Sequence, residues 1–181
     1  MTLCGRITLW CVALCVLPGE AQADVLTVNA TGTIAGSCLL TLASDFSTSA
    51  DLSVSGSSAA SATVDCTTPF KINATSSNGA LNNSVSAVSG FTNTLGYDLT
   101  ISVPLNSGGP ATATCASSLL VTGQSSCALS PGNTTGLYSG ATGSATNKTA
   151  TLTAAWITPA SPKLVAGAYS DTLTVSIAAV P

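Results

Sequence analysis

Apolar and polar residues alternate one by one through several short segments of this chain, and this pattern limits the fold more than any other feature. In the longest example, every second residue from Leu95 to Val103 is apolar or aromatic. Side chains of a strand point alternately to two faces, so such a segment forms a strand with one buried face. No segment combines the period of a three-turn helix with capping residues. The chain is therefore predicted to be all-β.

The same alternation predicts strands at 60–66, 70–74, 150–156 and 169–178, with a shorter strand at 38–42. Weaker signals favour short strands at 52–54 and 119–121. Residues 106–147 are mostly Gly, Ser, Thr, Pro and Ala, and we expect a long loop region there. Short strands at regular spacing, separated by turn residues, favour a β-sandwich.

The segment 24–38 (DVLTVNATGTIAGSC) also reads as a strand, and no hairpin turn follows that would fold it onto a neighbour. One of its faces carries Leu26, Val28, Ala30 and Ile34, and the other face is mostly polar. The sequence thus raises the question of what this strand pairs with.

Residues 1–23 have the features of a secretory signal peptide. Arg6 precedes the apolar run 7–17, and Ala21-Gln22-Ala23 fits a cleavage site after Ala23. The apolar run is too short to cross a bilayer, which requires about 20 residues. We therefore expect an exported chain that begins at Asp24 and has no transmembrane segment.

Charged residues are scarce in the predicted mature chain. Lys71, Lys148 and Lys163 are its only cations, and the whole sequence contains no His. Nucleic-acid binding requires a basic patch, so a nucleic-acid partner is not expected. Without His, Glu or Arg after residue 23, catalytic triads and most acid–base pairs cannot be assembled. We predict no enzyme activity, no catalytic residue and no cofactor.

Four cysteines remain after signal removal, namely Cys38, Cys66, Cys115 and Cys127. An even number in an exported chain implies disulfides, and four cysteines allow three pairings. We favour Cys38–Cys66 and Cys115–Cys127, which join neighbours in sequence. A zinc site is the alternative, but the chain has no CxxC pair and no His, so no metal is expected.

Several segments together resemble the spore coat protein U domain. Gly36–Leu40 (GSCLL) resembles the opening of that domain, and Val64–Thr67 (VDCT) resembles its second cysteine. Leu95–Leu99 (LGYDL) is similar to the L-x-Y-x-L strand of the family. The most specific match is Ala166–Val175 (AGAYSDTLTV), which is similar to the G-x-Y-x-D-T ending. Many members of this family are subunits of archaic chaperone–usher pili.

The resemblance implies an incomplete immunoglobulin-like sandwich of six strands plus an N-terminal donor strand. Residues 24–37 would be the donor extension and residues 38–181 the pilin domain. Leu26, Val28, Ala30 and Ile34 would then fill the groove of another subunit, by donor-strand complementation. The groove walls would be formed by Leu40, Leu42, Leu173, Val175 and Ile177.

The implied partners are a periplasmic chaperone, an outer-membrane usher and neighbouring pilin subunits in a head-to-tail polymer. Such a subunit passes through the periplasm to a surface pilus that supports adhesion and biofilm formation. Two alternatives share the fold. One is a secreted, self-complemented spore or cell coat protein, and the other is a single-domain adhesin.

Overall fold

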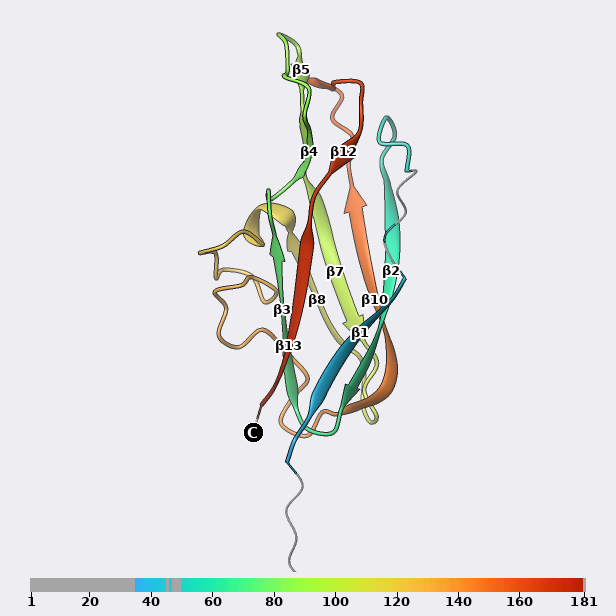
Figure 1. Ribbon diagram of the computed structural model, residues 1–181, viewed down its shortest axis with the longest axis vertical. Coiled ribbons are helices and arrows are strands. Elements are labelled where there is room, and N and C mark those ends of the chain that lie inside the picture. The colour runs from blue at the N-terminus through green and yellow to red at the C-terminus, as the bar shows by residue number, and fades with distance from the viewer. Residues whose placement is uncertain (1–34, 45, 47–49, 181) are drawn as a thin grey trace, which may run out of the picture. The chain divides into compact units, whose positions relative to one another are not determined.

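The fold consists of two antiparallel sheets that pack face to face, extended at one end by short strand pairs (Figure 1). The computed structural model describes residues 35–44, 46 and 50–180, all of which belong to one compact unit. These residues contain no α-helix, and their one helical turn is the 3-10 helix η1 (Ser117–Leu119). The predicted all-β sandwich is therefore confirmed.

The larger sheet has five strands in the order β1-β2-β10-β7-β8, each antiparallel to its neighbours. The strands are β1 (Cys38–Ser44), β2 (Gly56–Cys66), β10 (Ala145–Trp156), β7 (Tyr97–Val103) and β8 (Ala111–Ala116). On β7 the predicted inward row is fully buried, since Leu99, Ile101 and Val103 are at most 1% exposed.

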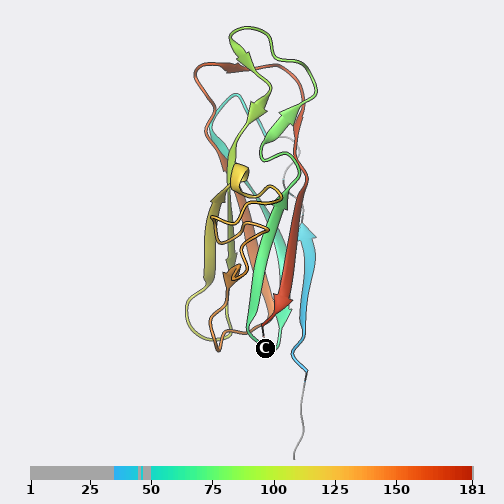
Figure 2. The same ribbon diagram turned by 90° about the vertical axis from the view of Figure 1, so that its left-hand side faces the viewer.

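The smaller sheet has the order β13-β3-β9 and lies against the larger one (Figure 2). Its strands are β3 (Phe70–Ser76), β13 (Leu173–Ala179) and β9 (Leu137–Tyr138). The core lies between the sheets, where Phe70 and Ile72 of β3 are buried together with Val64 of β2 and Leu99 of β7. Burial of such side chains contributes about 1.5–3 kcal/mol each and is the main force that holds the layers together.

Short strands form the end of the sandwich that lies away from the C-terminus, which we call the tip (Figure 1). One group is antiparallel and contains β4 (Leu81–Asn83), β6 (Thr94–Leu95) and β12 (Tyr169–Ser170). The other is a parallel pair of β5 (Phe91–Thr92) and β11 (Lys163–Leu164).

Three predictions from the sequence are wrong in detail. Residues 119–121 are not a strand, because η1 and a turn occupy this segment, with Leu120 N donating to Ser117 O (3.0 Å). Residues 52–54 form a turn, in which Ser53 N donates to Asp51 Oδ1 (2.9 Å). The region 106–147 contains β8, β9 and the start of β10, so it is more ordered than a long loop.

The predicted last strand, 169–178, is interrupted. The chain pairs with β4 in β12 and then, after Asp171 and Thr172, pairs with β3 in β13. Between these strands the chain therefore passes from one sheet to another at Asp171.

Candidate functional site: the opening between β1 and β13

Two edge strands face each other along one side of the sandwich. Among the described residues, β1 pairs only with β2, and β13 pairs only with β3 on its own sheet. The two strands are in contact, run in opposite directions and are not joined by a backbone ladder. In Figure 1 they are closest near the C-terminal end of the sandwich and diverge toward the tip. We call the space between these two edges the opening.

On the β13 side, the residues that face the core are incompletely covered. Val175 lies opposite Ala74 and Ile177 opposite Ile72, and these β3 partners are at most 1% exposed. Cross-strand partners point to the same face, so Val175 and Ile177 point toward the core. They and Leu173 nevertheless remain only partly buried. The β3 row is sealed, whereas the neighbouring β13 row is not.

On the β1 side, the core-facing residues are covered even less completely. Leu40 and Leu42 lie opposite Val64 and Ala62, which are buried, so both leucines point toward the core. Leu40 is partly buried against the core, but Leu42 is 59% exposed. Leu39 lies opposite the exposed Asp65 on the outer face and is 62% exposed. Leu42 therefore has the orientation of a core residue and the exposure of a surface residue.

The other edge of the smaller sheet is closed by the segment 117–136. Ala74 N of β3 donates to Leu129 O, and Ser76 N donates to Leu120 O, both at 2.8 Å. The side chains of Leu120 and Leu129 are fully buried. The backbone N–H groups on this edge of β3 are thus satisfied by a loop and not by a further strand. The contrast places the incompletely covered apolar rows on the β1–β13 side.

Both favoured disulfides are present, Cys38–Cys66 and Cys115–Cys127. Cys38 and Cys66 are register partners, so this bond fixes the start of β1 to the end of β2. Next to it, Ser37 N donates to Thr67 Oγ1 (3.2 Å) and Thr67 N donates to Ser37 O (3.1 Å). The start of β1, at the narrow end of the opening, is therefore held covalently to β2.

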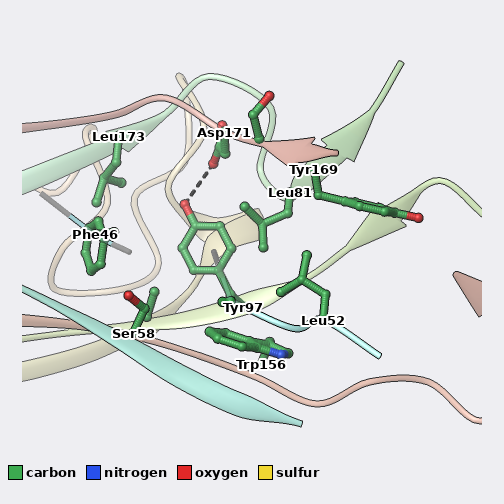
Figure 3. Close-up of a pocket in the computed structure, with 12 residues that line it drawn as sticks. Phe46, Leu52, Ser58, Leu81, Tyr97, Trp156, Tyr169, Asp171 and Leu173 are labelled. Carbon is green, nitrogen blue, oxygen red and sulfur yellow. Dashed lines mark hydrogen bonds between the residues drawn. The ribbon is translucent and has the colours of Figure 1, made fainter. Parts of the chain in front are cut away.

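A cavity of about 310 Å³ lies between Phe46, which follows the end of β1, and Leu173 at the start of β13. Its walls come from segments that are far apart in sequence and are mainly apolar or aromatic. They include Phe46, Leu52, Leu81, Tyr97, Trp156 and Leu173. Figure 3 shows the Tyr97 ring in the middle of this group, between Trp156 and Leu81, with its hydroxyl directed at Asp171. The cavity is large enough for an apolar side chain from outside the domain.

Asp171 forms the polar part of the cavity wall. Its Oδ2 accepts hydrogen bonds from the Tyr97 hydroxyl (2.7 Å) and from Ser76 Oγ (2.5 Å). Its Oδ1 accepts from the backbone N–H groups of Asn78 (3.1 Å) and Thr172 (2.9 Å). Burial, the hydrogen bond to Asp171 and the charge of that carboxylate raise the pKa of Tyr97 well above its ordinary value. Tyr97 is therefore a neutral donor at any physiological pH.

The sequence does not predict this cluster, although alternation places Tyr97 in a buried row and the closing motif includes Asp171. The break in alternation at Asp171 and Thr172 was the signal that could have identified a side chain with a special role.

The donor residues Leu26, Val28, Ala30 and Ile34, and the cleavage site after Ala23, lie outside the described residues, so their roles stay predictions. Of the predicted donor segment only residues 35–37 are described, and they are not in a strand. Within the described ranges no group of three or more acidic, Cys or His side chains could hold a metal ion. No helix in that part of the chain is long and apolar enough to cross a membrane.

Comparisons with protein-family models, with curated proteins and with solved structures found no match to this chain.

Proposed function

We propose that this protein is a structural subunit of a surface pilus, in which the segment 24–37 of one chain inserts into the opening of another. The single observation that carries the proposal is the state of Leu42, which points toward the core and yet is 59% exposed. An inserted strand would pair with the free edges of β1 and β13 and would cover both incompletely buried apolar rows. The immunoglobulin-like incomplete sandwich, with one strand missing, belongs to the same proposal.

The proposal assigns the two sides of the contact to different segments. Leu26, Val28, Ala30 and Ile34 are the inserted side chains, because they share one face of a strand. Leu40, Leu42, Leu173, Val175 and Ile177 line the opening. Because donor and acceptor surfaces differ, the contact is heterologous and repeats without closing.

An exposed pair of strand edges with apolar side chains is an aggregation hazard before assembly. This supports a chaperone that covers the opening during export, and an usher that exchanges the chaperone for the next subunit. The two disulfides are typical of proteins in oxidising compartments such as the periplasm.

The direction of residues 35–37 favours insertion into another chain over self-complementation. To reach its own opening, the extension would have to reverse direction before β1, and the described residues 35–37 make no such reversal. A two-residue hairpin needs a residue with positive φ, and Gly36 does not have one. Instead, Ser37 continues the line of β1 through its hydrogen bonds with Thr67.

Deletion of residues 24–35 behind the signal peptide tests this assignment. The shortened chain should fold and accept a strand but donate none, so alone it should give no fibres by electron microscopy of the cell surface. Co-expressed with the full chain, it should shorten the fibres in proportion to its dose, because each copy ends growth. Normal fibres from the shortened chain alone would refute the donor role. A full chain that stays a stable monomer without any chaperone would favour the self-complemented coat protein.

A further inference from the structure

We propose that Asp171 is a positioning residue for strand acceptance, which fixes the start of β13 so that the wide end of the opening stays open. The inference rests on the proposed function, because it concerns how the same opening receives a strand. It assigns a role to an acidic residue that neither the strand pattern nor the apolar rows explain.

Asp171 has a special place in the chain, between two strands that pair in different sheets. It lies between β12, which pairs with β4, and β13, which pairs with β3. The pairing of β13 with β3 ends next to Asp171, where Ser77 N donates to Thr172 O (3.0 Å). The hydrogen bonds of the Asp171 side chain act beside this last backbone bond, so together with it they fix the position of Leu173, two residues further along the chain.

The Asp171 carboxylate connects the two sheets. Ser76 belongs to β3 of the smaller sheet, whereas Tyr97 belongs to β7 of the larger sheet, and both donate to the same oxygen. Ser76 Oγ in turn accepts from Gly79 N (2.7 Å), so the turn after β3 is part of the network. Asp171 thus ties the two layers together at the tip end of the sandwich. Hydrogen bonds to an ionised acceptor are about twice as strong as neutral ones.

The two side chains that donate to Asp171 are buried. Ser76 is 2% exposed and Tyr97 is 7% exposed, so water cannot replace the carboxylate as their acceptor without a rearrangement. Among the described residues that line the cavity, Asp171 alone carries a charge, and Leu173 lies on the same wall. If the carboxylate were lost, the Tyr97 ring and the start of β13 would be free to relax into the cavity. Figure 3 shows the Tyr97 ring among the side chains that line the cavity.

The test uses the full chain and a fluorescein-labelled peptide of residues 24–37 as the probe, with binding followed by fluorescence anisotropy. Asp171→Asn should weaken binding of the peptide about ten-fold, and Tyr97→Phe, which keeps the ring, should weaken it less. The double variant should bind as Asp171→Asn does, because both changes break one network. Asp98→Asn is the matched control, since it also removes one negative charge. Asp98 follows Tyr97 in β7 and is exposed on the outer face of that strand.

A second readout separates positioning from general stability. Absorbance titration of the tyrosines should show that one tyrosine ionises at lower pH in Asp171→Asn than in the wild type, as expected if the carboxylate holds Tyr97. All affinities are measured well below the melting temperature of the weakest variant. A residue that only stabilises the fold would lower that temperature and leave the affinity for the peptide unchanged.

The outcomes distinguish the two proposals. If the wild-type chain does not bind the peptide, the proposed function fails, and this inference fails with it. If the wild type binds the peptide and both Asp171→Asn and Tyr97→Phe bind it with the wild-type affinity, only the role of Asp171 is refuted. An equal loss in Asp98→Asn would also refute it, because the effect would then be one of net charge.

Discussion

Leu39 and Leu42 offer a matched pair of substitutions that tests the opening directly. Both are leucines of β1 with similar exposure, 62% and 59%, but they lie on opposite faces of the strand. Leu39→Asp and Leu42→Asp should therefore change the stability of the isolated chain by small amounts, as is usual for surface positions. Leu39→Asp should carry an additional cost of roughly 0.2–1 kcal/mol, because its register partner is Asp65. Their effects on assembly should differ.

The expected difference follows from the exposed fractions. Full burial of a leucine contributes about 1.5–3 kcal/mol, and more than half of Leu42 is still available for burial by an inserted strand. Leu42→Asp loses roughly 1–2 kcal/mol of that contribution, and it also places an unpaired carboxylate against an apolar strand. A total of about 3 kcal/mol corresponds to roughly a hundred-fold weaker binding of the peptide of residues 24–37.

The assay measures fibre yield from cells and peptide affinity in solution, with thermal unfolding of each variant as the stability control. Leu42→Asp should abolish or strongly shorten fibres, and Leu39→Asp should leave them near the wild-type length. The reasoning would be refuted by equal losses in both variants, or by a larger loss in Leu39→Asp. Either result would mean that the core-facing side of β1 is not covered during assembly.

The remaining predictions concern the stability of the subunit. Replacing Cys38 and Cys66 by Ser should lower the free energy of unfolding by about 3–4 kcal/mol in the chain-entropy model for a separation of 28 residues, measured by urea denaturation and by the yield of folded subunit. The same change at Cys115 and Cys127, with a separation of 12, should cost about 3 kcal/mol, and an unchanged urea midpoint would contradict either estimate. The folded state raises the pKa of Tyr97, so its stabilising effect is full below the ordinary tyrosine pKa of 10.0 and is lost as the pH rises above it. The melting temperature of the wild type should therefore fall above about pH 10, and that of Tyr97→Phe should fall less steeply over the same pH range.

The parts of the fold that the sequence predicted are those with bulky alternating residues. Leu99, Ile101 and Val103 alternate with polar residues, and their strand was found where expected. The strand β8 was missed because its inward positions, such as Ala111 and Ala113, are small and give little contrast with the threonines between them. Alternation is a signal of side-chain burial, so it weakens where the buried side chain is small.

The segment 117–136 misled the prediction for a different reason. Three consecutive apolar residues at 119–121 favoured a strand, but Leu120 is a single buried side chain within a turn. The segment is held by local polar bonds that have no periodic pattern. Asn133 Nδ2 donates to Cys127 O (3.1 Å), and Ser130 Oγ donates to Leu119 O (2.6 Å).

The candidate site was predictable only along its strands. Alternation placed Leu173, Val175 and Ile177 on one face of the last strand, and they do share the core-facing side. The exposure of Leu42 could not be predicted, since it depends on which strands lie beside β1 in the fold. The cavity could not be predicted from the sequence either, because its walls come from the ends of β2, β7 and β10, from Asp171 before β13 and from Leu173 at the start of β13.

The closed side of the sandwich has a consequence for the architecture of any assembly. Because the segment 117–136 occupies the other edge of β3, the described part of the smaller sheet has its long open edge at β13, and the proposed extension supplies one strand. A monomer with one donor and one acceptor has a valence of two. Such monomers can form only unbranched filaments, and a larger supply of chains makes the filaments longer but does not branch them.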